Sequence, residues 1–189
     1  YNEKKYTLEQ LAQAIKADFK GFEKMRDDLK SAPKYGNDDD YADDIMVSVF
    51  NEYKDYITGR PTTRGGVYHV DMLPTTCHVY FGDVMIASPN GRLAHIPLSE
   101  GISPEKGADI NGPTAVVKSC SKMNHCETGG TLLNQKFTPA AIAGEKGIDN
   151  LAALIRSYFA MNGHHMQFNV IDRQTLIEAQ KNPEEYKEL

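Results

Sequence analysis

The second half of the chain alternates helical and strand-like segments, and this alternation is the feature that most constrains its fold. Residue patterns predict helices near 113–123, at 150–161 and at 173–180, and strands at 131–137 and 165–171. Strands that are separated by a helix usually pair in parallel through a crossover connection. The sequence therefore predicts an α/β fold.

The first half is expected to contribute helices followed by extended segments. Residues 7–30 carry apolar side chains at helical spacing behind a suitable N-cap, Thr7, and residues 41–57 carry a second apolar stripe. This second stripe consists of Ile45, Val49, Phe50 and Tyr53. Residues 67–72 and 75–81 are rich in β-branched and aromatic side chains, which favour extended backbone. A helical layer is thus expected to precede the alternating half.

Charge and hydropathy argue against two classes of partner. The chain has 189 residues and a net charge of -5, so it offers no excess of Lys and Arg to neutralise the phosphates of a nucleic acid. No apolar run approaches the roughly 20 residues that span a bilayer. We therefore expect neither a nucleic-acid partner nor a membrane partner.

Cysteine usage indicates a reducing compartment. Cys77, Cys120 and Cys126 are odd in number and lack CxxC spacing, which predicts free thiols and not a disulfide framework. This pattern favours a cytoplasmic location.

The acidic cluster at residues 38–44 is predicted to be the solvated start of a helix. Calcium prefers several carboxylates, but the spacing of an EF-hand loop and its bidentate Glu are absent. Carboxylates in the first turn stabilise the positive end of a helix dipole, which explains the cluster without a metal.

The histidines and thiols form no recognisable catalytic or metal motif. His164 and His165 are adjacent, and neighbours in a regular strand point to opposite faces, so they do not share one ion. The segment 119–121, near His125, lacks the Gly-x-Ser-x-Gly pattern of a nucleophile elbow. Cys120 is therefore predicted to be a buried or half-buried thiol on a helix, and no residue is assigned as a metal ligand.

The strand predicted at 165–171 alternates polar and apolar side chains. Gln167 and Asn169, followed by Asp172, alternate with Met166, Phe168 and Val170. This pattern fits a strand with one buried apolar face and one solvated polar face. It also fits a polar face that is buried and supports an active site, and the alternation alone leaves both interpretations open.

A series of motifs runs through the chain in a fixed order. They are Tyr35-Gly36-Asn37-Asp38, Pro89-Asn90-Gly91-Arg92, and the segments 98–104, 112–122, 130–137 and 167–170. In order and spacing they resemble the C-terminal part of the glycyl radical enzymes, the family of pyruvate formate-lyase. The resemblance covers nearly the whole chain and departs at Asn90, where the family has Asp.

The resemblance implies an α/β fold that is part of a ten-stranded β/α barrel. Residues 1–100 would form the end of the pyruvate formate-lyase-like barrel domain, and residues 101–189 the start of the glycine radical domain, without its radical loop. The radical glycine is expected after Leu189 and the thiyl cysteine before Tyr1, so no residue here receives a catalytic role. An isolated section of such a barrel should expose apolar strand and helix surface.

The resemblance also implies radical chemistry with partners. A glycyl radical, installed by a separate activating enzyme that uses S-adenosylmethionine and an iron–sulfur cluster, oxidises a cysteine to a thiyl. The thiyl abstracts a hydrogen atom from a small-molecule substrate, and the product radical recovers it. No cofactor is expected to bind this chain directly. The expected partners are the substrate, the activating enzyme, the remainder of the parent polypeptide and a second copy in a homodimer, in an anaerobic cytoplasm.

The motif details are similar to the dehydratase and lyase branch of the family. They imply radical cleavage of a C–O bond, or of a C–N or C–C bond, with a hydroxylated compound such as trans-4-hydroxy-L-proline or a diol as substrate. A formate acetyltransferase-type or decarboxylase activity, and a non-catalytic structural or interaction domain, remain as alternatives. Tyr68, Val70 and Met72, which share one side of an extended segment, are expected to border the substrate cavity, although ordinary barrel packing explains them too.

Overall fold

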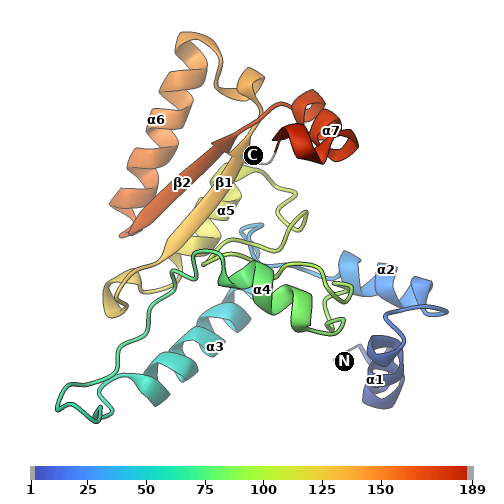
Figure 1. The fold of residues 1–189 in the computed structure, drawn as a ribbon. Coiled ribbons are helices and arrows are strands. Elements are labelled where there is room, and N and C mark those ends of the chain that lie inside the picture. The colour runs from blue at the N-terminus through green and yellow to red at the C-terminus, as the bar shows by residue number, and fades with distance from the viewer. Residues whose placement is uncertain (1–2, 187–189) are drawn as a thin grey trace.

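The computed structural model describes residues 3–186 and has a mixed α/β architecture built around a small parallel sheet (Figure 1). The α-helices are α1 (Leu8–Lys16), α2 (Glu23–Ser31), α3 (Asp40–Ile57), α4 (Cys77–Val84), α5 (Pro113–Ser121), α6 (Gly144–Ala160) and α7 (Arg173–Lys181). The strands are β1 (Leu132–Phe137) and β2 (His165–Val170). Figure 1 shows α1 and α2 at one end of the molecule, away from α6 and the strands.

The predicted crossover is present as a β1–α6–β2 unit. The strands pair in parallel, with a register that runs from Leu132 opposite His165 to Phe137 opposite Val170. Helix α6 begins at Gly144, six residues earlier than the apolar pattern at 150–161 indicated, because its first turns carry polar and small residues. The α/β fold class predicted from the sequence is therefore confirmed, while the part of the chain that the structure describes contains only these two strands.

The main core lies where α3, α5, α6 and β1 meet. Its buried members are Phe50, Ile102, Val116, Val117, Cys120, Met123, Leu133 and Tyr158. Helix α5 contributes three of them from a short segment that Pro113 opens, as expected for Pro in a first helical turn. Burial of these side chains anchors the sheet to the helices.

The single helix predicted over residues 7–30 is wrong. Thr7 does cap a helix, since its Oγ1 accepts the Gln10 amide at 3.1 Å, but α1 ends at Lys16 and α2 begins at Glu23. Between them Asp18 and Phe19 have positive φ, which reverses the chain. The reversal buries Phe19 in a second core with Ala14, Met25 and Ala87, so tertiary packing outweighs the helical pattern.

The extended segment predicted at 75–81 is also wrong, because residues 77–84 form α4. The Cys77 amide donates to the Pro74 carbonyl oxygen at 2.9 Å and starts the helix. At Gly82 a Cβ would lie 2.4 Å from Pro97 Cα, so the absence of a side chain lets the helix pack on the following loop. Residues 67–72 are joined to the rest of the chain by isolated bridges at Val67 and Met72.

The acidic cluster does start a helix, but one member is not solvated. Asp39 caps α3 by accepting the Tyr41 amide, and Asp40 is exposed, as predicted. Asp43, by contrast, is completely buried, and its Oδ2 accepts hydrogen bonds from Ser119 Oγ at 2.8 Å and Lys122 Nζ at 2.7 Å. The sequence pattern could not reveal these partners, because Ser119 lies in the last turn of α5 and Lys122 directly follows that helix.

Lys122 is held in its charged form by this network. Partial burial acts to lower the pKa of Lys122, but its hydrogen bonds to Asp40 and Asp43 outweigh this effect, and its pKa lies above the ordinary value. The buried carboxylate of Asp43 is thus paired with an ammonium group and not isolated, which is the condition for tolerating a buried charge.

Helices α3 and α4 expose broad apolar surfaces. Tyr41, Ile45, Val49 and Tyr53, spaced four residues apart on α3, all have exposed side chains, so only Phe50 of the predicted stripe is buried. On and after α4 the exposed apolar residues are Val79, Tyr80, Phe81, Val84, Met85 and Ile86. The expectation of exposed apolar helix surface is confirmed. No helix of residues 3–186 combines the length and apolar character needed to cross a membrane.

We predict that Asp43→Ala lowers the free energy of unfolding by about 3–5 kcal/mol, because it leaves the Lys122 ammonium without its buried partner. The matched variant Asp40→Ala removes an exposed carboxylate bonded to the same ammonium and should cost less than about 1 kcal/mol. Urea unfolding of the polypeptide that carries this sequence measures both. Equal losses would contradict the importance that we assign to the buried pair.

Candidate functional site

The two faces of the β1–β2 sheet differ in chemistry and in covering. In a parallel pair, residues opposite each other point to the same face. One face carries Leu133 and Met166, which pack in the main core with Tyr158 of α6. The other face carries Leu132 and then polar residues from both strands. They are Asn134, Lys136, His165, Gln167 and Asn169.

We call these five residues the polar strand face. Lys136, His165 and Gln167 are exposed, while Asn134 and Asn169 are half-buried. The apolar side chains of β2 therefore face the helices, and its polar side chains face away from them. The alternation in β2 left open whether its polar face is solvated or buried. Within residues 3–186 this face is only partly covered.

The loop at residues 99–109 runs along the edge of β1 that does not pair with β2, next to Asn134 of the polar strand face. The Ile102 amide donates to the Leu132 carbonyl oxygen at 2.9 Å, and the Asn134 amide donates to Ser103 Oγ at 2.9 Å. A hollow of about 150 Å³ lies between this loop and β1, lined by Glu100 and Asn134 among others. Asn134 Oδ1 is buried and has no hydrogen-bond partner among the residues that the structure describes.

The lining of this hollow is polar and charged. The Asn134 amide and the Ser103 hydroxyl lie beside the charged side chains of Glu100, Lys106, Asp109 and Lys136. Such groups orient hydroxyl and carboxylate ligands by hydrogen bonding. The sequence did not single out Asn134. The signal that could have found it is the two-residue spacing of Asn134 and Lys136 in a predicted strand, which places both side chains on one face.

Of the three predicted cavity residues, Tyr68 ends the hairpin at residues 59–68, and Val70 and Met72 lie on the segment that follows it. Val70 is buried, and its carbonyl oxygen accepts the Gly129 amide at 2.8 Å. Met72 pairs with Thr131 and packs against the main core. Tyr68 has an exposed side chain. The structure thus holds the segment beside β1 through Val70 and Met72, while the Tyr68 backbone pairs with Gly59 and Arg60 and its side chain stays exposed.

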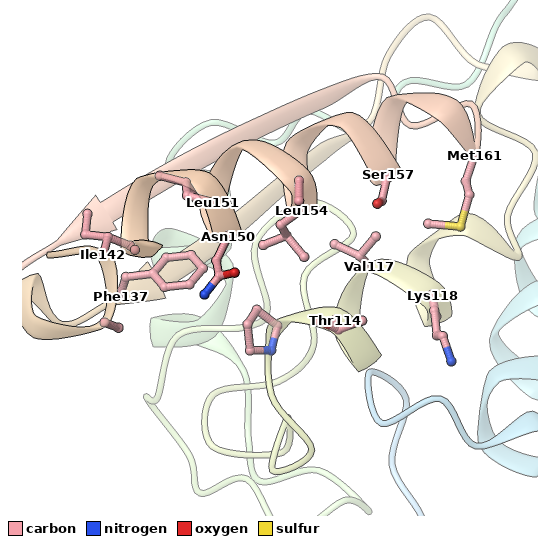
Figure 2. Close-up of a pocket in the computed structure, with 14 residues that line it drawn as sticks. Thr114, Val117, Lys118, Phe137, Ile142, Asn150, Leu151, Leu154, Ser157 and Met161 are labelled. Carbon is pink, nitrogen blue, oxygen red and sulfur yellow. The ribbon is translucent and has the colours of Figure 1, made fainter. Parts of the chain in front are cut away.

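On the opposite side, α5 and α6 enclose an apolar cleft of about 670 Å³ (Figure 2). Figure 2 shows Val117 and Leu154 pointing toward one another across it, with Phe137 and Ile142 at one end and Met161 at the other. The polar side chains at the cleft are Thr114, Lys118, Asn150 and Ser157. This set includes neither a cysteine nor a carboxylate, so the cleft is a packing surface more than a reaction site.

The thiol and imidazole on the helix side are built into the core. Burial raises the pKa of Cys120 to about 12, so it stays a neutral thiol at physiological pH, as predicted for a buried cysteine. The Tyr35 hydroxyl lies 3.0 Å from its sulfur and 2.9 Å from the Ile102 carbonyl oxygen. Burial also lowers the pKa of His125, whose Nδ1 is 2.9 Å from Thr131 Oγ1.

These contacts assemble no nucleophile–base pair. The Ser119 hydroxyl donates to Asp43, and Cys120 is enclosed by Tyr35 and Ile102. Among residues 3–186, no group of three or more His, Cys, Asp and Glu side chains is placed to hold a metal ion.

Together these features describe a section of an α/β protein: helices pack on one side of the strands, and a polar strand face with a polar hollow beside it is left on the other. Two family models match the chain, one described as "Glycine radical" over residues 98–189 and one as "Pyruvate formate lyase-like" over residues 1–82. The chain belongs to the glycyl radical enzyme family.

Known relatives support this assignment over the full length of the chain. It is 60% identical over 190 residues to trans-4-hydroxy-L-proline dehydratase of Clostridioides difficile, covering 100% of this chain and 24% of that protein. The crystal structure of that organism's hydroxyproline dehydratase, solved with substrate bound, matches with a TM-score of 0.95 and 60% identity over 100% of this chain and 24% of that one.

A second solved structure has the same fold at lower identity. It is the glycerol-bound B12-independent glycerol dehydratase of Clostridium butyricum, with a TM-score of 0.90 and 43% identity, covering 100% of this chain and 24% of that chain. The chain thus spans about a quarter of the length of the relatives that it matches.

We predict that Gly101→Ala displaces the 99–109 loop from β1. Gly101 has a φ of 56°, and an added Cβ would lie 2.2 Å from the Leu132 carbonyl oxygen, so the loss in unfolding free energy should be about 2–4 kcal/mol. Gly107→Ala is the matched control: its φ is 78° but no atom lies within 4 Å, so only the backbone strain of about 1 kcal/mol applies. Urea unfolding compares the two, and similar losses would refute the close approach as the cause.

Proposed function

We propose that the polypeptide carrying this section is a glycyl radical dehydratase or lyase that cleaves a C–O bond of a small hydroxylated substrate, with trans-4-hydroxy-L-proline as the leading candidate. The observation that carries the proposal is the 60% identity, over the whole chain, to an enzyme named for that dehydration. The similarity to a glycerol dehydratase makes a diol the second candidate. A decarboxylase or formate acetyltransferase-type activity remains a weaker alternative.

The proposed chemistry places the radical residues elsewhere in the parent. A separate activating enzyme, using S-adenosylmethionine and an iron–sulfur cluster, would install a glycyl radical, and a cysteine would relay it as a thiyl. The thiyl takes a hydrogen atom from a substrate carbon, the neighbouring C–O bond breaks with loss of water, and the product radical takes the hydrogen atom back. The residues of this chain would help to bind and enclose the substrate, and the chain alone would be inactive.

The proposed architecture is a ten-stranded β/α barrel of which β1 and β2 are two strands. Residues 1–100 would end the barrel domain and residues 101–189 would begin the glycine radical domain. Two features support this arrangement: α6 packs on the apolar face of the sheet, as an outer barrel helix does, and the polar strand face lies on the other side. In a closed barrel that polar face would line the interior.

The remainder of the parent polypeptide is the proposed partner of the exposed apolar surfaces on α3 and α4. Soluble proteins rarely leave contiguous apolar patches of this kind uncovered. This also argues against a free-standing interaction domain, which would need to cover these side chains itself. By family likeness we further propose that the whole enzyme is a homodimer of the cytoplasm.

We propose that Tyr68, Val70 and Met72 border the substrate cavity, with different roles. Tyr68 is the one with an exposed side chain, so it is the candidate for direct substrate contact. Val70 and Met72 would position the segment through their buried side chains and their backbone bonds beside β1.

The substrate assignment is tested with the full-length parent, activated anaerobically by its activating enzyme. After the glycyl radical has been counted by electron paramagnetic resonance, trans-4-hydroxy-L-proline, glycerol and an arylacetate are each supplied. We expect hydroxyproline to be converted to a product lighter by one water, with at least about 100-fold higher kcat/KM than glycerol. Conversion of only another compound would overturn the substrate assignment, and a radical-free, inactive protein would overturn the radical proposal.

We predict that Tyr68→Ala lowers kcat/KM about tenfold, the loss expected from one removed substrate contact of about 1.4 kcal/mol. The radical yield should not change, because Tyr68 plays no part in forming the radical. Leu176→Ala, which removes a comparably exposed apolar side chain from α7, serves as the control and should stay within about twofold. An unchanged kcat/KM in Tyr68→Ala would show that Tyr68 does not contact the substrate.

A further inference from the structure

A second pocket joins three segments that are far apart in the sequence. It has a volume of about 280 Å³ and lies between the C-terminal part of α2, the turn and loop at residues 90–97, and the loop at residues 105–108. Gly91 allows the close approach: it has a φ of 93°, and a Cβ there would lie 2.7 Å from Lys30 Cγ.

The charges around this pocket are strongly unbalanced. Its lining includes five cationic side chains and a single carboxylate: Arg26, Lys30, Lys34, Arg92, Lys106 and Glu105. The chain as a whole carries a net charge of -5, so the local charge of the pocket is opposite in sign to that of the whole chain. None of the five cations forms a salt bridge within residues 3–186, although ion pairs occur elsewhere. The positive potential of the pocket is therefore not neutralised by direct contacts.

Arg92 is the most buried of these cations, with 5% of its surface exposed. Its guanidinium donates to the carbonyl oxygens of Leu93, Ile96 and Ile86, at 3.0, 2.7 and 2.6 Å, and its Nε donates to Ser88 Oγ at 3.1 Å. These partners satisfy its hydrogen bonds but carry no charge. The Glu105 carboxylate acts electrostatically on Arg92, Lys34 and Lys30 but forms no salt bridge with Arg92, so the buried guanidinium still adds to the attraction of the pocket for an anion.

The remaining groups leave that attraction in place. Lys34 donates to the Leu29 and Ala32 carbonyl oxygens, at 2.6 and 2.9 Å, and its pKa is lowered by burial and partly restored by Glu105. Arg26 uses its Nε on the Gly91 carbonyl oxygen, which leaves the rest of its guanidinium available. Lys30 and Lys106 are exposed at the edge. Glu105 can offset one of the five charges.

We propose that this pocket is a binding site for a free oxyanion, of the phosphate or sulfate class, that ties α2 to the 90–97 and 105–108 loops. The pocket is large enough for an anion with a small organic group attached. Oxyanions accept several charge-assisted hydrogen bonds at once, which suits the convergence of Arg26, Lys30 and Lys106. This site goes beyond the proposed radical activity and does not depend on its substrate.

The test uses the full-length parent, without radical activation, in a buffer free of phosphate. Inorganic phosphate is titrated by calorimetry against sodium chloride of equal ionic strength, which separates binding from general screening. We expect saturable binding at one site. In the double variant Lys30→Ala/Lys106→Ala the dissociation constant should rise about tenfold or more, the loss expected when charge-assisted hydrogen bonds are removed. Lys20→Ala, an exposed lysine away from the pocket, is the matched control and should bind phosphate as the unchanged protein does.

A second variant, expected to tighten phosphate binding, distinguishes a true binding site from an effect of misfolding. Glu105→Gln removes the one carboxylate of the pocket and should tighten phosphate binding by about threefold, a gain that a misfolded protein cannot produce. Tighter binding in Glu105→Gln together with weaker binding in the lysine variant supports the site. The proposal is overturned by the absence of saturable phosphate binding, or by binding that these three pocket residues do not change.

Discussion

The backbone of β1 is the element on which the rest of the structure depends, because both of its edges are occupied. One edge pairs with β2 over the full length of both strands. On the other edge, the Leu132 amide donates to Met72 and the Leu132 carbonyl oxygen accepts from Ile102. A central strand must satisfy its backbone groups in this way, and doing so brings together four segments spread over about 100 residues of sequence. Loss of this strand would separate the predicted cavity segment, the 99–109 loop and β2 at once.

The parts of the fold that could be predicted are those that local pattern decides. The strand at 165–171, the helix opened by Pro113 and the cap at Thr7 follow from residue spacing and from backbone chemistry, and all three are present. The failures have tertiary causes. Phe19 fits a helical stripe but leaves it to fill a separate core, and the β-branched run at 75–81 becomes α4, which packs at Gly82 on the backbone of Pro97.

The functional surface was predicted less completely than the family. Motifs in register over nearly the whole chain identified the glycyl radical enzymes, and the matching family models agree. Alternation in β2 indicated a polar face, but only the register with β1 shows that Asn134 shares it. Asp43 could not be found from the sequence, since its acidic neighbours look alike and its partners Ser119 and Lys122 come from a distant helix. A sequence pattern indicates which residue types share one face of an element. The hydrogen-bond partners from distant segments become known only from the fold.

The central claim is that this chain is one section of a larger barrel whose remaining parts cover α3, α4 and the polar strand face. Hydrogen–deuterium exchange tests it most directly, by comparing β1, β2 and α3 in the isolated residues 1–189 with the same peptides in the full-length parent. We predict that these amides exchange at least about 100-fold faster in the isolated chain, because part of their protecting surface is missing. Equal protection in both proteins would show that the chain is stable by itself and would contradict the account.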